Sequence, residues 1–309
     1  MELSDCSVSL SGLFCLEDGS LLDADDRDDE VDEELFIYRN GSLLSQPEDE
    51  HIGALVSKET SFGTSGHSLS FPGDSLRRAR FESIRWILKT NSCFGFGSQT
   101  AYLAVTYFDR FFLLRTIDET KIWAMRLLSI ACLSLAAKME ECSPPALPEF
   151  RQGEYQFSSR IVQRMELLVL DTLEWRLSSV TPFSYLSYFA FKFHSGCSPK
   201  NLISQAIWFI FVILEDSGMN IVDFRPSTIA AAAILAASSS DGLTKKLIES
   251  KMSTFSLPEP LEIEQVFSCY NAMILESKKE KMRSFNVTDS RTSGTSNKSE
   301  KKIANSSLK

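Results

Sequence analysis

Apolar residues recur at helical spacing along the chain from about residue 74 onward. In "SLRRARFESIRWILKTNS", Phe81, Ile84 and Leu88 fall on one face of a helix. The next segment, "SQTAYLAVTYFDRFFLLR", predicts a second helix, with Ser98 expected as its N-cap. A third, "DETKIWAMRLLSIACLSLAAKMEE", is apolar nearly all round after Met125, which is typical of a helix in the middle of a bundle.

Two further helical patterns complete this first group. "CSPPALPEF" breaks the third helix with its prolines and begins a short fourth one, and "SSRIVQRMELLVLDTLEWRL" is a fifth with apolar residues on two faces. A similar plan then recurs in the second half of the chain. Five more helical patterns follow: "PFSYLSYFAFKF", "PKNLISQAIWFIFVILED", "PSTIAAAAILAASS", "LTKKLIESK" and "LEIEQVFSCYNAMILESKKEKM". The third of these is again small and apolar. Because strand patterns are weak, the sequence predicts an all-α fold of two consecutive five-helix bundles.

Both ends of the chain are too polar to form a core. The first 72 residues are rich in Ser, Gly, Asp and Glu, and the run "DADDRDDEVDEE" cannot bury itself, so we expect a disordered acidic arm. The last segment turns to Ser, Asn, Thr and Lys and predicts a disordered basic tail. The expected domains are therefore the arm, the two bundles and the tail, at residues 1–72, 73–178, 179–283 and 284–309.

Composition narrows the classes of function. The chain has 309 residues, 43% of them hydrophobic, and a net charge of −9, which argues against a protein that binds nucleic-acid phosphates. Its seven cysteines form no CxxC pair and indicate reduced thiols. The apolar runs are shorter than the about 20 residues that cross a bilayer, and we identify no secretory signal. We therefore expect no nucleic-acid and no membrane partner.

Catalytic and metal-binding motifs are absent from the sequence. The three histidines are His51, His67 and His194, and no HExxH, GxSxG or P-loop pattern occurs. The acidic run fails as a calcium loop because it lacks the central glycine. We expect no cofactor, no metal and no enzymatic activity, and we interpret the two bundles as a protein that binds other proteins.

Four segments of the first bundle resemble a known family. "RFESIRWILK", "TAYLAVTYFDRFF", "LLSIACLSLAAKMEE" and "RMELLVLDTLEWRL" resemble the cyclin box in order, spacing and character, and with "LFCLE" ahead of them the chain resembles a D-type cyclin of the plant kind. The resemblance implies a regulatory subunit that binds and activates a cyclin-dependent Ser/Thr kinase without catalysing a reaction itself. It also implies a buried ion pair between Arg80 and Asp109 that ties the first two helices together.

The resemblance further implies where the kinase binds. Lys138 and Glu166 match the lysine and glutamate that hold the mobile helix of the kinase, since each can hydrogen-bond backbone groups of that helix. The apolar residues expected to line the same groove are Leu135, Met139, Leu170, Trp175 and Leu177. Without the resemblance, Lys138 would be an ordinary charge at a helix C-terminus and Glu166 an ordinary surface acid.

One departure from the family lies on the first helix of the first bundle. Many cyclins have a Met-Arg-Ala-Ile-Leu patch there, which recruits substrates with an Arg-x-Leu motif. The matching residues here are Ala79, Arg80, Phe81, Glu82 and Ser83, with Trp86 retained after them. Because Glu82 and Ser83 replace two apolar contacts, we expect substrate docking at this patch to be lost or to differ in preference.

Leu13, Cys15 and Glu17 form a motif within the acidic arm. In an extended strand these alternate residues face the same way. They match the Leu-x-Cys-x-Glu motif by which D-type cyclins bind retinoblastoma-family proteins, with Cys15 as a small hydrophobe; a chance triplet is the alternative. The resemblance thus implies a retinoblastoma-related partner and a role in the G1/S transition, with kinase-inhibitor proteins as a further class of partner.

Two other functions are compatible with these patterns. One is a cyclin-fold factor of the transcription machinery, against which the acidic charge and the lack of a zinc ribbon count. The other is a kinase-independent scaffold, which the altered first-helix patch allows. For a cell-cycle cyclin we expect a nuclear location, with the cytoplasm as a second one. "SKKEKMR" and "KSEKK" are weak candidates for import signals, and solvated charge is the simpler explanation of each.

Overall fold

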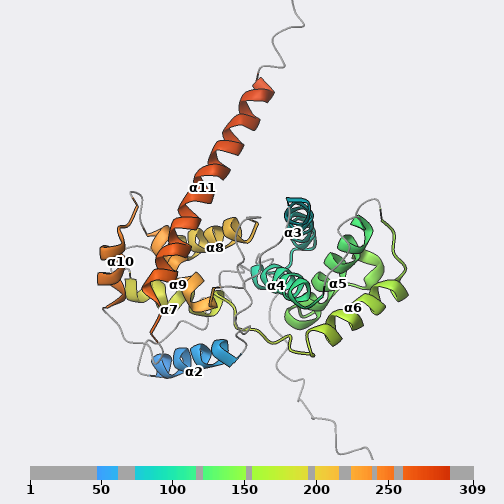
Figure 1. The fold of residues 1–309 in the computed structure, drawn as a ribbon, viewed down its shortest axis with the longest axis horizontal. Coiled ribbons are helices and arrows are strands. Elements are labelled where there is room, and N and C mark those ends of the chain that lie inside the picture. The colour runs from blue at the N-terminus through green and yellow to red at the C-terminus, as the bar shows by residue number, and fades with distance from the viewer. Residues whose placement is uncertain are drawn as a thin grey trace, which may run out of the picture.

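Two helical bundles make up most of the computed structural model, which describes residues 47–61, 74–115, 121–150, 155–193, 199–215, 224–238, 242–253 and 260–292. All regular elements among these residues are helices (Figure 1). The first bundle contains α3 (Asp74–Phe94), α4 (Ser98–Leu114), α5 (Ile122–Glu140), the 3₁₀ helix η2 (Leu147–Phe150) and α6 (Ser159–Thr172). The second contains α7 (Phe183–Phe193), α8 (Pro199–Glu215), α9 (Pro226–Ala237), α10 (Lys245–Met252) and α11 (Ile263–Thr292). The all-α fold of two consecutive bundles is confirmed.

Each bundle has one buried helix at its centre, as its composition predicts. Every residue of α5 from Ala124 to Ala137 is buried except Arg126, and α5 packs against α3, α4 and α6. By length and composition alone α5 could span a membrane, but most of it lies inside the bundle. In the second bundle, α9 is buried from Ser227 to Ala236 and contacts α7, α8 and α11. The alanines of α9 allow neighbouring helices to approach closely.

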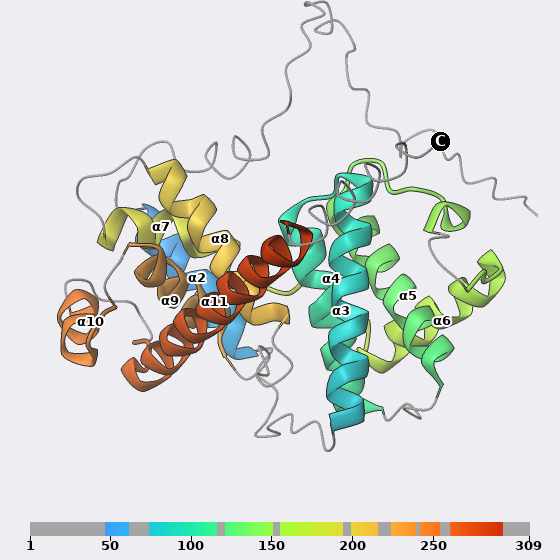
Figure 2. The same ribbon diagram turned by 90° about the horizontal axis from the view of Figure 1, so that it is seen from above.

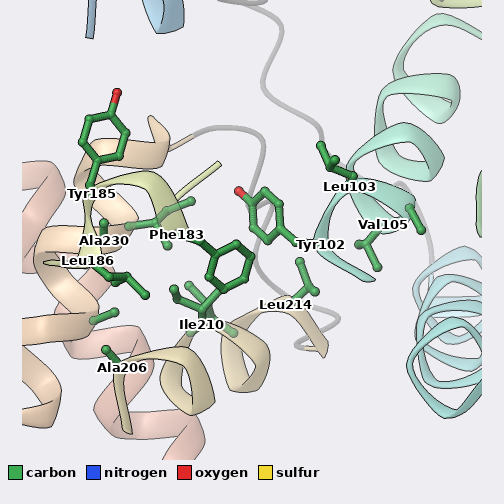
Figure 3. Packing of buried hydrophobic residues seen from close by; sticks show 14 of the residues in the cluster. Tyr102, Leu103, Val105, Phe183, Tyr185, Leu186, Ala206, Ile210, Leu214 and Ala230 are labelled. Atoms are coloured by element: carbon green, nitrogen blue, oxygen red, sulfur yellow. The ribbon is translucent and has the colours of Figure 1, made fainter. Parts of the chain in front are cut away.

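The two bundles lie side by side when the molecule is seen from above (Figure 2). Tyr102 of α4 and Phe183 of α7 join them through an edge-to-face contact, with ring centroids 5.7 Å apart. Figure 3 shows these two rings pointing toward one another, with Ile210 and Leu214 of α8 beside them. The hydroxyl of Tyr107 donates a hydrogen bond to the carbonyl oxygen of Leu177 at 2.9 Å. These contacts fix the chain where it passes from the first bundle to the second.

One helix was not expected from the sequence. The helix α2 (Pro47–Ser61) lies inside the segment assigned to the disordered arm, and the assignment is wrong for these residues. Its buried side chains include Ile52 and Val56, one helical turn apart, and Figure 1 shows α2 beneath α7 and α9. With so few apolar residues, α2 has too weak a periodicity to be recognised in the sequence.

The remaining arm residues, including Leu13, Cys15 and Glu17, lie outside the described residues. At the other end, α11 continues to Thr292, beyond the expected end of the second bundle at residue 283. Figure 1 shows its C-terminal half projecting away from the other helices. The tail after Thr292 lies outside the described residues.

Candidate functional site

Lys138 and Glu166 meet where α5 ends beside α6. The Nζ atom of Lys138 donates to Oε1 of Glu166 at 2.7 Å. The side chain of Glu166 is 7% exposed and that of Lys138 is 42% exposed. The carboxylate is thus held below the surface, and the ammonium group extends from it toward solvent. The structure brings together the two polar residues that the family resemblance assigns to kinase binding.

A carboxylate just after Lys138 attaches the end of α5 to the start of α4. Glu141, the C-cap residue of α5, accepts a hydrogen bond from the backbone N–H of Gly97 at 3.0 Å and another from the hydroxyl of Thr100. The N-cap of α4 is Gly97, which has no side chain that could cap the helix, so the expectation that Ser98 is the N-cap is wrong. An anionic acceptor from another helix supplies the cap instead.

Glu140 makes a second contact with the first turn of α4. Its Oε2 atom accepts a hydrogen bond from Nε2 of Gln99 at 2.6 Å. Burial, together with the neighbouring charge of Glu141, raises the pKa of Glu140. The two glutamates therefore hold the last turn of α5, which carries Lys138, against a second helix. Within the described part of the chain, no three His, Cys, Asp or Glu side chains gather in a group that could hold a metal ion.

The apolar residues expected around the ion pair divide into two groups. Met139 and Trp175 are exposed and Leu170 is half-buried, so all three are available for contact. Leu135 and Leu177 are buried in the core, at 6% and 8% exposure, which corrects the expectation that they line the binding surface. Both leucines belong to the hydrophobic core of the molecule.

Two exposed apolar residues of α6 were missed in the sequence. Ile161 and Leu167 are both exposed, and Leu167 directly follows Glu166. Their signal in the sequence is the pattern of apolar residues on two faces of this helix, which does not by itself show that one of the faces is exposed. We call the surface formed by Lys138, Met139, Glu166 and Leu167 the α5–α6 face.

The chain leaves α6 through a tight turn. Glu174 and Trp175 have φ values of 52° and 60°, in the left-handed region that favours glycine. The backbone N–H of Trp175 donates to the carbonyl oxygen of Leu170 at 2.9 Å, which closes the end of the helix. The turn leaves Trp175 exposed and brings Leu177 back into the core two residues later.

Arg80 and Asp109 form a buried ion pair between α3 and α4. Nε and Nη2 of Arg80 donate to Oδ1 and Oδ2 of Asp109 at 2.8 and 2.7 Å. Both side chains are 1% exposed. The two parallel hydrogen bonds fix the orientation of α3 on the bundle. The structure therefore brings together the two residues that the resemblance assigns to this pair.

The altered patch on α3 is divided between the interior and solvent. Ser83 is buried, and its hydroxyl donates to the carbonyl oxygen of Ala79 at 2.8 Å. Glu82 is exposed, and Phe81 is half-buried. Trp86 is also half-buried, with the guanidinium carbon of Arg126 4.7 Å from the centroid of its ring. A partner at this surface would therefore meet charge beside aromatic rings.

Comparisons with known proteins agree with the two-bundle fold. Residues 53–178 match the family "Cyclin, N-terminal domain", and residues 180–306 match "Cyclin, C-terminal domain". The first match begins inside α2, twenty residues before the expected start of the first bundle at residue 73.

Relatives from plants cover most of the chain. Cyclin-D1-1 of Arabidopsis thaliana is 38% identical over 275 residues, which are 86% of this chain and 78% of that protein. Cyclin-D5-2 and Cyclin-D5-1 of Oryza sativa subsp. japonica are each 47% identical, over 64% and 66% of this chain. The aligned regions span only 58% and 56% of these two rice proteins.

A solved structure has the same fold. The viral cyclin from herpesvirus saimiri superposes with a TM-score of 0.53 at 14% identity, covering 74% of this chain and 95% of that one. At so low an identity the likeness concerns the arrangement of the helices alone.

Proposed function

This chain belongs to the D-type cyclins, and we propose that it binds and activates a cyclin-dependent Ser/Thr kinase through its α5–α6 face. The observation that carries the proposal is the contact between Lys138 and Glu166, in which the glutamate is buried and the lysine is partly exposed. The exposed apolar residues Met139 and Leu167 directly follow the two charged residues in the sequence. Two directional polar groups in an apolar surface are suited to hold a docking helix in one register.

Activation follows from binding one kinase conformation more tightly than another. The kinase helix that docks here carries a glutamate, which pairs with the catalytic lysine only when that helix is turned inward. Lys138 and Glu166 would hydrogen-bond backbone groups of the inward helix, while Met139 and Leu167 cover its apolar side. The degree of activation is limited by the difference in affinity for the two kinase states.

The proposal extends to a retinoblastoma-related substrate protein. The support is the sequence motif of Leu13, Cys15 and Glu17, whose alternate spacing lets all three side chains project together from an extended strand. Such a cyclin would bring its kinase to this substrate in the nucleus at the G1/S transition. Kinase-inhibitor proteins would compete with the kinase or the substrate for the same surfaces.

A kinase assay tests the α5–α6 face. Purified kinase subunit is mixed with the full-length protein or with Lys138→Ala/Glu166→Ala, and phosphorylation of a retinoblastoma-related fragment is measured. We expect the double variant to lose about 100-fold or more in activation, since removing polar anchors at an interface centre costs several kcal/mol. The matched control is Lys245→Ala/Glu264→Ala, which removes a lysine–glutamate pair on the second bundle.

The same assay tests the arm. Cys15→Ala should reduce phosphorylation of the retinoblastoma-related fragment while leaving activity toward a short peptide unchanged. If the wild-type protein binds the kinase but activates it on neither substrate, the activator role is wrong and a scaffold function takes its place. Salt-dependent binding to DNA by the wild-type protein would instead favour the transcription-factor alternative.

A further inference from the structure

The helix α3 presents a row of basic side chains to solvent. Arg78, Arg85 and Lys89 are exposed, and their spacing of seven and four residues places them along one face. The row extends over about 16 Å of helix axis at ~1.5 Å per residue. Glu82 lies within it, which still leaves an excess of positive charge. Figure 2 shows α3 on the outside of the first bundle, with no described helix drawn over it.

Aromatic rings border this basic row. The guanidinium carbon of Arg85 lies 5.6 Å from the centroid of the Phe81 ring, and that of Arg126 lies 4.7 Å from the centroid of the Trp86 ring. Stacking on a ring restrains a guanidinium group and leaves the N–H donors at its edge directed sideways. The face therefore offers oriented donors for carboxylates beside half-buried aromatic surface.

The matching negative charge lies in the same chain. The first 46 residues contain thirteen acidic and two basic side chains. Their net charge is therefore −11, which is more negative than the net charge of −9 of the whole protein. The rest of the chain therefore has a net charge of +2. Nine of the acidic residues fall within residues 23–34, "DADDRDDEVDEE". Opposite charges of this density within one molecule attract one another strongly at low ionic strength.

We propose that residues 23–34 bind along the basic row of α3 in the free protein. An extended stretch of about five residues spans roughly 16 Å, which matches the length of the row. Asp23 is separated from Pro47, the first residue of α2, by 23 residues. Such a tether reaches up to ~75 Å at ~3.3 Å per residue, several times the about 13 Å radius of gyration of a 100-residue domain.

Tethering allows weak contacts to hold the acidic run in place. Exposed ion pairs are individually weak and are screened by salt. A tether within one chain keeps the acidic run near α3 at an effective concentration in the millimolar range, on the order of what such contacts need. When bound, the run would cover the face of α3 that the family resemblance assigns to substrate docking, so an acidic arm would compete with incoming partners there.

Zero-length cross-linking of the full-length protein tests this proposal. A carbodiimide joins lysine amines to carboxylates in contact, and mass spectrometry identifies the joined peptides. We expect cross-links between Lys89 and residues 23–34 that do not depend on protein concentration. They should fall about fivefold or more at about 0.5 M salt, because the Debye length is then only a few ångströms.

Arginine variants test whether the basic row of α3 causes the cross-linking of Lys89 to residues 23–34. Arg78→Ser/Arg85→Ser should reduce the Lys89 cross-links about fivefold, since it removes two of the three cations from the row. Arg160→Ser/Arg164→Ser removes two exposed arginines of α6 and should leave the cross-links unchanged.

Two results would overturn the proposal. The first is cross-linking of the arm to distant exposed lysines, such as Lys246 and Lys278, as readily as to Lys89 in every variant. The second is cross-linking between chains in proportion to protein concentration, which would assign the face of α3 to a second copy of the protein.

Discussion

At the scale of the residue, buried charge is what connects the first two helices of the first bundle. Arg80 and Asp109 are both almost fully buried and are bonded through two parallel hydrogen bonds. A pair of this kind adds little net stability compared with an apolar pair of the same volume, because both charges must leave water. Removing only one partner nevertheless lowers the free energy of unfolding strongly, since the other charge stays buried.

Single and double variants separate these two effects. Asp109→Ala should lower the free energy of unfolding by about 3–5 kcal/mol, because the Arg80 guanidinium is left buried without its carboxylate. The paired variant Arg80→Met/Asp109→Leu should lose much less. Urea denaturation of the purified protein measures both. If the paired variant is as unstable as the single one, the charge pair itself contributes the stability.

Thiol chemistry provides a second prediction for single residues. Burial raises the pKa of Cys132 and raises that of Cys269 to about 12, so both thiols stay protonated. Cys93 and Cys142 are exposed and not in a disulfide. In a native labelling experiment at about pH 8, Cys93 and Cys142 should react within minutes and the buried pair only after unfolding. Equal labelling of all four would show that the bundles open readily.

At the scale of the element, helices hold one another by their ends. The N-terminus of α4 is capped by Glu141 of α5, and the N-terminus of α9 is capped by Glu59 of α2. In the second case the two carboxylate oxygens of Glu59 accept from the backbone N–H and the hydroxyl of Ser227, both at 2.7 Å. Each cap joins two elements that are far apart in the sequence.

The cap on α4 is expected to affect kinase binding. Glu141→Ala should destabilise the protein by about 1–2 kcal/mol, as loss of a helix cap does. It should also weaken binding of the kinase subunit, because the last turn of α5 with Lys138 is no longer held against α4. Calorimetric binding and thermal unfolding are compared with Glu149→Ala, whose carboxylate accepts a hydrogen bond from the backbone N–H of Ala146 three residues before it. A loss of stability without any loss of kinase binding would contradict the positioning role.

The cap on α9 is expected to depend on pH. Burial raises the pKa of Glu59 above its ordinary value of 4.5. At a pH between the ordinary pKa and the raised one, Glu59 is protonated in the folded protein and ionised in the unfolded chain. The contribution of Glu59 to stability is therefore fully present below 4.5 and decreases as the pH rises through the raised value.

Two variants of Glu59 test this dependence by thermal unfolding between about pH 4.5 and pH 7. Glu59→Gln keeps an acceptor for Ser227 and should remove this part of the pH dependence. Glu59→Ala leaves the N–H of Ser227 without its partner and should cost about 1–3 kcal/mol. If the wild type and Glu59→Gln show the same dependence on pH, another group is responsible.

At the scale of the whole molecule, the order of the chain differs from the order of its packing. The helix α2 precedes the first bundle in sequence but packs on the second, where Ile52, Val56 and Glu59 are buried. The segment 62–73 then leads to α3 in the first bundle. The helix α2 is therefore attached to the second bundle through Glu59 and Ser227, although the first bundle separates the two in sequence.

Truncation should reveal this connection. Deleting residues 1–61 should destabilise the second bundle, because α9 loses its cap and the buried side chains of Ile52 and Val56 are removed. Deleting residues 1–46 should not. In the protein without residues 1–61, we expect the backbone amides of α7 and α9 to exchange hydrogen faster, and those of α3 and α5 to change little. Equal acceleration in both bundles would indicate that α2 stabilises the molecule as a whole.

The sequence predicts whatever depends on local periodicity and on the family pattern. The helices of both bundles and the central positions of α5 and α9 follow from their apolar residues, and the meeting of Lys138 with Glu166 follows from the resemblance. The helix α2 has too few apolar residues to show a period, and Glu59 and Ser227 are 168 residues apart. The burial of Leu135 and Leu177 depends on how helices pack in three dimensions, which no spacing reveals.

The distance between Glu59 and Ser227 also has a consequence for synthesis. At ~5–20 residues per second, the ribosome needs roughly 8–34 s to add the 168 residues that separate the two. The first bundle is complete well before then, yet the apolar side of α2 still lacks its cover. During this interval the residues of α2 are exposed to chaperones and proteases in the growing chain, and we expect slower translation to lengthen that exposure.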